Sequence, residues 1–349
     1  MNLYLLLVST LFLGCSEKKQ TVSAPLPKRP AQIEPVNRTQ TVESSHPSLG
    51  EPISLPSSPT INEPTEEPKR RRVEFRRGKS YLQKRFKLPS KLKESSGLLK
   101  IDNRLWSFND SGGEAALYAI DERSGKITKT VRIINAKNRD WEDIAYDENY
   151  VYIGDFGNNR GNSRDLKIYK IPRAALRSQK RVRAEVIRFR YSDQKDFRLR
   201  PYKHNYDCEA MVAYHGKLYL FSKDWEDQKS RLYELSSSAG SHVAQYISSF
   251  NTQGMVTGAS INKELDLLLL TTYSPLLSVD IWAFKNFDGE NFFSGDAKKL
   301  TLSTSLGGQV EGVTFVDNYR AYLSSEAFHK YFVSFDAALY SLDFSREFE

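Results

Sequence analysis

The chain has 349 residues, of which 39% are hydrophobic and 12% aromatic, so it is long and apolar enough for one large packed domain with further segments. The net charge of +8 lies at one end, because residues 1–93 carry 17 Lys and Arg against 8 Asp and Glu, whereas the remainder carries 34 against 35. A nucleic-acid-binding domain needs a basic face on its folded part, so this distribution argues against a nucleic-acid partner.

The first 14 residues form an apolar run that ends at Cys15. Such a run is too short for a permanent membrane helix and is typical of a secretion signal. A Cys directly after it resembles a bacterial lipobox, in which the Cys becomes the lipidated first residue of the mature protein. We therefore expect a signal peptide over residues 1–14, lipidation at Cys15, and a protein anchored to a membrane of the bacterial cell envelope.

Residues 15–78 are rich in Pro, Ser, Thr, Glu and Lys and show no apolar periodicity. This composition predicts a disordered tether between the lipid anchor and a folded domain. Basic clusters at 69–72 and 76–77 suit contact with anionic lipid and an ordinary solvated linker equally well.

A pattern of short strands repeats five times between residues 94 and 349. Each repeat opens with a strand whose first residue is usually polar and whose third is apolar, and this period-2 spacing puts both side chains on one face. The first residues are Ser96, Glu142, Glu209, Thr257 and Glu311. The third residues are Leu98, Ile144, Met211, Ala259 and Val313. The third strand of each repeat carries an aromatic residue, namely Tyr118, Tyr169, Tyr233, Trp282 and Tyr340.

The fifth repeat ends without a fourth strand, but a spare strand at 79–88 precedes the first repeat. If that strand completes the last repeat, the ring closes and its sheet edges are removed. We therefore predict an all-β fold, a five-bladed β-propeller with four-stranded blades over residues 79–349. A β-sandwich explains the five matched aromatic positions and the displaced strand less well.

In a propeller the first strand of each blade runs along the central channel, so the five first residues converge there. Three of them are Glu, and neighbouring carboxylates repel one another unless a cation or proton lies between them. A ring of oxygen ligands suits Ca²⁺, and the lack of His and Cys argues against Zn²⁺. A water-filled polar tunnel and pairing with Arg or Lys stay open as alternatives. The predicted Ca²⁺ ligands are Ser96, Glu142, Glu209, Thr257 and Glu311.

The loops expected on the same face are rich in Asp, Lys, Arg, His and amide side chains, which could hold a phosphate or a sugar. Tight turns explain their Gly and Asn residues equally well. The candidate ligand-binding residues are Arg139, Asn158, Asn159, Arg160, His204 and Lys223. In a hydrolase, the residues that would position water are Asp110, Asp155 and Glu326.

The order Ser, Glu, Glu, hydroxyl residue, Glu at the channel positions resembles the calcium-activated nucleotidase (apyrase) family. Residues 94–98 and 104–110 look like its first blade, and residues 310–315 look like its last. The resemblance implies a five-bladed propeller with one Ca²⁺ in its channel that hydrolyses nucleoside di- and triphosphates. The family has an acidic loop after the second strand of blade one, whereas this chain has Asn-Asp-Ser-Gly-Gly at 109–113. The resemblance therefore implies metal binding more strongly than it implies hydrolysis.

That motif, with Asp-Trp-Glu-Asp-Ile-Ala at 140–145 and Gly-Asp-Phe-Gly-Asn-Asn at 154–159, more closely resembles a group of exported bacterial propeller proteins of unassigned function. This likeness implies a fold but no activity. We therefore expect a monomeric envelope lipoprotein whose propeller is a binding or scaffold module for a phosphorylated small molecule or an envelope protein. The alternative is a Ca²⁺-dependent phosphohydrolase acting on nucleotides or other phosphoesters, and a lactonase or glycan-active propeller is a weaker third option.

Overall fold

The computed structural model is almost entirely β structure in the parts of the chain that it describes. Those parts are residues 73–74, 81–274, 278–302, 309–330 and 333–347. They contain one α-helix, α2 (Arg173–Ser178), and no helix with the length and hydrophobicity that crossing a membrane requires. Three 3₁₀ turns are η1 (Ser90–Leu92), η2 (Phe292–Ser294) and η4 (Ser345–Glu347). The predicted signal peptide, Cys15 and nearly all of the predicted tether lie outside the described residues.

Most strands fall into five groups in which four neighbours pair antiparallel, from an innermost to an outermost strand. The innermost strands are β3 (Ser95–Ile101), β7 (Trp141–Tyr146), β12 (Asp207–Tyr214), β16 (Met255–Asn262) and β20 (Val310–Phe315). The second strands are β4 (Arg104–Asn109), β8 (Tyr150–Asp155), β13 (Lys217–Lys223), β17 (Leu267–Tyr273) and β21 (Arg320–Ser325). The third strands are β5 (Ala116–Ile120), β9 (Leu166–Pro172), β14 (Lys229–Ser236), β18 (Val279–Lys285) and β24 (Ala338–Asp343). The outermost strands are β6 (Ile127–Ile133), β11 (Glu185–Tyr191), β15 (Gly240–Asn251), β19 (Asp296–Thr301) and β2 (Tyr81–Lys87).

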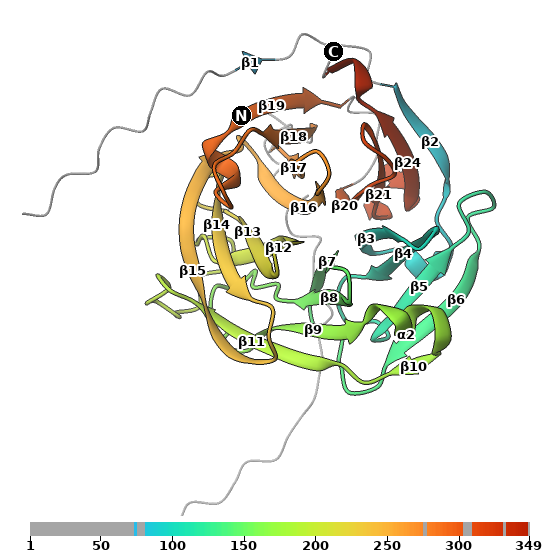
Figure 1. Ribbon diagram of the computed structural model, residues 1–349, viewed down its shortest axis with the longest axis horizontal. Helices are drawn as coiled ribbons and strands as arrows, with labels where there is room; N and C mark the ends of the chain where they lie inside the picture. The colour runs from blue at the N-terminus through green and yellow to red at the C-terminus, as the bar shows by residue number, and fades with distance from the viewer. Residues whose placement is uncertain (1–72, 75–80, 275–277, 303–308, 331–332, 348–349) are drawn as a thin grey trace, which may run out of the picture. The chain divides into compact units, whose positions relative to one another are not determined.

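The innermost strands surround a common centre (Figure 1). Each contacts the next in chain order, and the last, β20, contacts the first, β3. The hydrogen-bonded sheets radiate outward from this ring, so the prediction of an all-β, propeller-like fold is confirmed.

The strand that precedes the first group completes the last one. β2 pairs antiparallel with β24, with Leu82 opposite Leu342 and Gln83 opposite Ser341. This pairing confirms the prediction that the segment before the first repeat supplies the missing strand of the fifth.

Additional strands cover several outer edges. β10 (Arg181–Val182) pairs in parallel with β6, and β11 pairs in parallel with β15, which joins two groups into one eight-stranded sheet. β1 (Val73–Glu74) pairs in parallel with β19, although these two residues fall inside the segment predicted to be a disordered tether. An uncovered outer strand has backbone N–H and C=O groups without hydrogen-bond partners, and a neighbouring segment of the chain can pair with them.

The hydrophobic core lies between adjacent sheets, where the predicted aromatic residues of the third strands are buried. At most 6% of the surface of any of the five is exposed. Between the first two groups, the ring of Trp141 meets that of Phe108 edge-on at a centroid distance of 5.5 Å. The aromatic repeat therefore marks residues that fill the space between neighbouring sheets.

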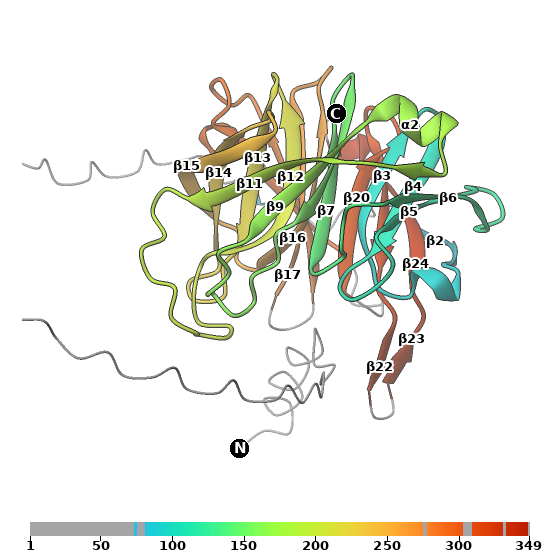
Figure 2. The same ribbon diagram turned by 90° about the horizontal axis from the view of Figure 1, so that it is seen from below.

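One hairpin stands apart from the sheets. β22 (Phe328–Lys330) and β23 (Val333–Phe335) pair antiparallel between β21 and β24, and Figure 2 shows them extending away from the other strands. Because β21 ends opposite the start of β20, the hairpin leaves from the end of the ring at which the innermost strands begin.

Candidate metal centre

Every innermost strand has a β-bulge near its first residues. The register against the second strand slips at each bulge, so an extra residue of the inner strand has no partner opposite it. The slips occur between Ser95 and Leu98, Trp141 and Ile144, Cys208 and Ala210, Val256 and Gly258, and Val310 and Gly312. These intervals contain all five predicted channel positions, namely Ser96, Glu142, Glu209, Thr257 and Glu311. A bulge changes the direction of the side chains next to it. Each of the five predicted channel residues therefore occupies the same position relative to a bulge in its strand.

Two of the bulges end at a glycine that allows neighbouring inner strands to approach closely. A Cβ atom on Gly258 would lie 2.1 Å from the carbonyl oxygen of Glu311, and one on Gly312 would lie 2.6 Å from that of Ser96. Real Cβ atoms essentially never come within 3.0 Å of another atom, so a larger residue would push the strands apart.

The apolar positions of the repeat face the same centre farther along the strands. They line one small apolar pocket, together with other residues of the inner strands and Lys263. They are Leu98, Ile144, Met211, Ala259 and Val313. The polar positions therefore lie toward the end at which the inner strands begin, and the apolar positions lie beyond them.

A buried carboxylate, that of Asp143, ties three inner strands together. It accepts hydrogen bonds from the backbone N–H groups of Ile144 on β7 (2.8 Å), Met211 on β12 (2.7 Å) and Ala259 on β16 (3.2 Å). Burial raises the pKa of Asp143, and the three backbone hydrogen bonds act in the opposite direction. Asp143 therefore takes the place of backbone pairing where the strands of different groups converge.

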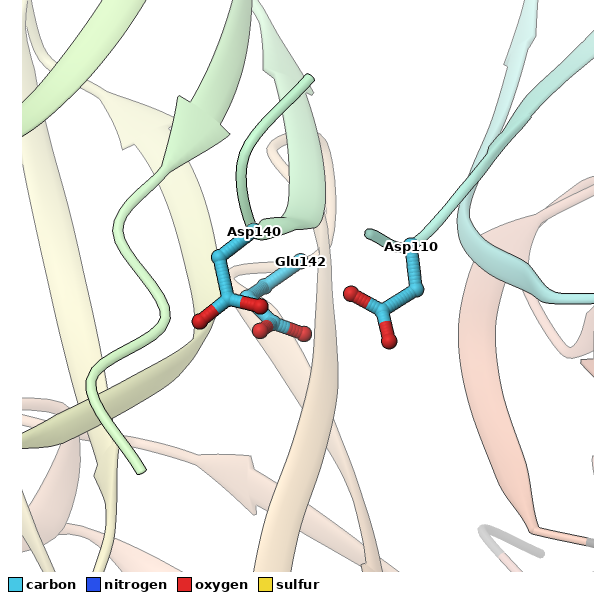
Figure 3. A group of neighbouring side chains, drawn as sticks. All are labelled: Asp110, Asp140 and Glu142. Atoms are coloured by element: carbon cyan, nitrogen blue, oxygen red, sulfur yellow. The ribbon is translucent and has the colours of Figure 1, made fainter. Parts of the chain in front are cut away.

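Three carboxylates gather at the polar end of the ring. An oxygen of Asp110, one of Asp140 and one of Glu142 all lie within 4.8 Å of one another. Figure 3 shows the side chains pointing toward a common space from two neighbouring groups of strands. We call these three residues the acidic triad.

The backbone around the acidic triad brings the carboxylates together. Asp110 directly follows β4, and Asp140 precedes β7, on which Glu142 lies. The carboxylate of Asp155 accepts the backbone N–H of Asp140 at 3.0 Å. A Cβ atom on Gly157 would meet Glu142 Oε1 at 2.2 Å and Asp140 Oδ2 at 2.3 Å, so the loop after β8 leaves room for both.

The charges of the acidic triad oppose one another in a site largely shielded from water. Burial, followed by the charge of Asp207, raises the pKa of Asp140 to about 7. Burial, followed by Glu209 and then Asp110, raises the pKa of Glu142 well above its usual value, and burial followed by Asp140 does the same for Asp110. Oδ1 of Asp110 is buried without a hydrogen-bond partner among the described residues. The charge of Lys223 acts against burial at all three residues, and protons or a bound cation would offset the negative charge that is left.

The other predicted channel residues have partners of their own. Glu209 forms a buried ion pair with Lys223, with 3.1 Å between Oε1 and Nζ. Glu311 has Glu326 as a hydrogen-bond partner, and burial followed by the charge of Glu311 raises the pKa of Glu326 well above its usual value.

The hydroxyl groups of the remaining two positions bridge neighbouring inner strands. Ser96 Oγ donates to the backbone oxygen of Glu142 at 2.5 Å, and Thr257 Oγ1 donates to that of Val310 at 2.7 Å. The structure thus places all five predicted ligands at one end of the ring but brings only Glu142 into the acidic triad.

The predicted loop residues are dispersed around this end. The guanidinium of Arg139 lies near the carboxylates of Asp155 and Asp165, and Arg160 is exposed. The side chain of Asn158 donates to Tyr206 O and accepts from Ser163 N, which are structural contacts of the loop.

The remaining two loop residues each leave one polar atom unused among the described residues. Oδ1 of Asn159 and Nε2 of His204 are buried without a hydrogen-bond partner there. His204 is itself 1% exposed, its Nδ1 accepts from Tyr206 N, and its ring lies against Gly161. The three predicted catalytic residues do not lie together in one group. Asp110 belongs to the acidic triad, Asp155 accepts the backbone N–H of Asp140, and Glu326 pairs with Glu311.

Asp140, Asp143 and Asp207 are the site residues that the sequence patterns did not single out as ligands or supports. Asp140 and Glu142 are two residues apart, so the alternation that identified Glu142 also placed Asp140 on its face. Asp207 accepts the backbone N–H of Asn158 at 2.6 Å and Nε1 of Trp225 at 2.8 Å. No local pattern distinguishes such a support from an ordinary polar residue.

No family model matches the chain, and no curated protein matches it. Among solved structures, it is similar to the PQQ-bound form of aldose sugar dehydrogenase from Streptomyces coelicolor, with a TM-score of 0.44 and 11% identity, over 76% of this chain and 98% of that chain. A similarity at this level says nothing about the ligand or chemistry of this chain.

Proposed function

We propose that the chain is a lipid-anchored protein of the bacterial cell envelope whose five-bladed β-propeller is a binding or scaffold module with a Ca²⁺ site at one end of its channel. The five groups of four strands are the blades in this proposal, and Cys15 is the point of lipidation. Glu142, with Asp110 and Asp140, supplies the first ligands of the ion. The other predicted channel residues surround it as an outer ring.

The spacing of the acidic triad is the observation that supports a metal ion most directly. Ca²⁺ binds oxygen at about 2.4 Å, so no two of its oxygen ligands lie more than about 4.8 Å apart. The three triad oxygens lie within 4.8 Å of one another, and all are carboxylate oxygens. Oδ1 of Asp110, buried without a hydrogen-bond partner among the described residues, is an available ligand atom. This donor set fits a hard cation, and a bound Ca²⁺ would offset the mutual repulsion of the carboxylates.

The cationic groups around the site favour a binding module over a hydrolase. A phosphohydrolase needs positive groups that hold the transferred phosphate. Lys223 is buried but paired with Glu209, Arg139 faces Asp155 and Asp165, and Arg160 is exposed. Against the larger effect of burial, the charge of Lys223 lowers the pKa of all three triad residues, and that of Arg139 lowers the pKa of Asp140. These two cations therefore balance carboxylates of the site instead of being left for a phosphate.

Ca²⁺ should raise the thermal unfolding midpoint of the protein, and the rise should be larger at pH 8 than at pH 5.5. The folded-state pKa of Asp140, about 7, exceeds its ordinary value of 3.8. Without metal, the stabilisation from protonating Asp140 is therefore lost as the pH rises through about 7. Above that pH the carboxylate is charged, and Ca²⁺ no longer competes with a proton. Scanning calorimetry of the full chain with Ca²⁺ or EDTA at both pH values measures the difference.

Mg²⁺ at the same concentration is the control for general ionic effects, because it prefers a compact octahedral shell with several waters. We expect a smaller rise with Mg²⁺ than with Ca²⁺. Identical midpoints with Ca²⁺ and with EDTA at pH 8 would refute the metal site and leave the carboxylates as the lining of a polar channel.

The runner-up function is a Ca²⁺-dependent phosphohydrolase, and the Glu311–Glu326 pair is the observation that favours it. Their carboxyl groups are hydrogen-bond partners, and burial raises the pKa of both, which suits such a pair to acid–base chemistry. A panel of nucleoside di- and triphosphates and simple phosphoesters, assayed for phosphate release, separates the two functions. We expect no release above background for a binding module. Release that requires Ca²⁺ and is lost in Glu326→Gln would establish the hydrolase instead.

A further inference from the structure

A second charged site lies at the opposite end of the first group of strands from the acidic triad. It is a groove of about 870 Å³, which falls within the size range of small-molecule pockets. β4 separates the two sites, because Arg104 is its first residue and Asp110 follows its last. Six residues of strand span roughly 20 Å. We call this second site the basic groove.

The first and last groups of strands form most of the walls of the basic groove, and Lys180 comes from the segment between α2 and β10. β2 and β21 of the last group contribute Arg85 and Tyr322. The first group contributes the turn between β3 and β4, the loop after β5, and β6. The cationic residues in the lining are Arg85, Arg104, Arg123, Lys129 and Lys180. Because these residues come from separate elements, their charges surround a recess instead of following one strand.

The acidic residues of the lining are engaged elsewhere. Glu122 forms an ion pair with Lys100 at 2.5 Å. Asp121 accepts hydrogen bonds from the backbone N–H of Ser124 at 2.7 Å and from its hydroxyl at 2.6 Å. The Ser124 hydrogen bonds and, to a smaller extent, the charge of Arg123 lower the pKa of Asp121. Neither carboxylate forms an ion pair with a groove cation among the described residues, and the five cations of the lining outnumber its two acids.

Four of the five cationic side chains, those of Arg85, Arg104, Arg123 and Lys180, make no ion pair or hydrogen bond with any described residue. The arginines of the adjacent helix α2 behave differently. Arg173 and Arg177 both bind the carboxylate of Asp102, in the same turn that precedes Arg104. The fold thus pairs the two arginines beside the groove with a carboxylate but leaves these four cations of its lining without an ion pair among the described residues.

Lys129 shows that the cations in the groove affect one another. Its Nζ donates to the carbonyl oxygens of Leu176 (2.8 Å) and Arg177 (2.6 Å) at the end of α2. Burial, followed by the charges of Arg104 and Lys180, lowers the pKa of Lys129. An anion between these three side chains would relieve the repulsion, so the groove favours a ligand that carries several negative charges.

We propose that the basic groove is a binding site for a small anion bearing two or more phosphate groups. Three of its unpaired cations are arginines, whose planar guanidinium groups can bind two phosphate oxygens at once. The recess between two sheets matches a compact ligand better than a flat membrane surface. This site is independent of the acidic triad, because it has the opposite charge and lies at the other end of β4.

Isothermal titration of the full chain with tripolyphosphate tests the proposal. The groove variant is the double substitution Arg104→Gln and Lys180→Gln. The matched control is Arg188→Gln with Arg190→Gln, which removes the same charge from exposed positions on β11. We expect one tripolyphosphate per chain, at least tenfold weaker binding in the groove variant, and less than a twofold change in the control. All four side chains are exposed, so the unfolding midpoints of both variants should match that of the unmodified protein.

Several outcomes would overturn the proposal. Equal weakening in both variants would mean that tripolyphosphate responds only to net charge. Unchanged affinity in the groove variant would place the binding elsewhere, for example in the basic N-terminal region. Vesicles containing an anionic lipid form a second arm of the test. If they bind in a groove-dependent manner while tripolyphosphate does not bind, the groove contacts a membrane and not a small phosphorylated ligand.

Discussion

Replacement of Asp143 by Ala should lower the free energy of unfolding by about 4 kcal/mol or more, because it would leave three buried backbone N–H groups without an acceptor. These groups belong to Ile144, Met211 and Ala259 on three different inner strands. Each unsatisfied buried donor costs about 1–3 kcal/mol. A typical domain is stable by only about 5–15 kcal/mol, so the variant should be marginally folded. Urea unfolding followed by circular dichroism measures the change.

Asp336→Ala is the matched control for this substitution. Asp336 is an exposed carboxylate that pairs with Lys87 at 2.8 Å, and an exposed pair of this kind contributes at most about 1 kcal/mol. Asp143→Asn should fall between the two, because an amide oxygen can accept some of the three hydrogen bonds but its NH₂ group cannot. If Asp143→Ala were no more destabilised than the control, the three hydrogen bonds would not hold the inner strands together.

Removal of a single triad carboxylate should abolish the rise in unfolding midpoint caused by Ca²⁺. An ion that binds only the folded protein raises the free energy of unfolding by about 2.7 kcal/mol when it is present at 100 times its dissociation constant. A variant that lacks one coordinating carboxylate should lose most of this stabilisation. Asp110→Asn and Asp140→Asn test the acidic triad, and calorimetry at pH 8 with Ca²⁺ and with EDTA gives the result. Both variants relieve charge repulsion, so they should be at least as stable as the unmodified protein in EDTA.

Substitutions in the outer ring distinguish the acidic triad from the ligand set expected from the repeats. Thr257→Val and Glu311→Gln change residues of the predicted ring that lie outside the triad. If the triad supplies the ligands, both variants should keep the response to Ca²⁺. If they lose it while Asp110→Asn and Asp140→Asn keep it, the ion lies deeper in the channel among the five bulge residues.

The local patterns of the chain predicted most of the propeller-like architecture. Alternation of polar and apolar residues has a period of two, so it marks a strand and its buried face without knowledge of its neighbours. The residues at 96 and 98, and their counterparts in the other four repeats, therefore appeared as inner-strand positions. In the structure, residue 98 and its counterparts line one common pocket. The missing outer strand of the fifth group was likewise predicted from a count of strands.

The pairings at the periphery depend on distances that no local pattern encodes. Val73–Glu74 joins β19, and β11 joins β15, because these edges happen to pass beside one another in the assembled fold. Backbone hydrogen bonds place little demand on side chains, so such contacts leave almost no signal in the sequence.

The sequence by itself determined the five repeats, their inner faces and the concentration of carboxylates at one end of the ring. Only the tertiary structure decided which carboxylates meet. The end of β4 and the start of β7 bring Asp110 to Asp140 and Glu142, while Lys223 pairs with Glu209 and Glu326 pairs with Glu311. Periodicity assigns a side chain to a face of its own strand, but electrostatic interactions fall off over a few ångströms and depend on how neighbouring sheets are placed.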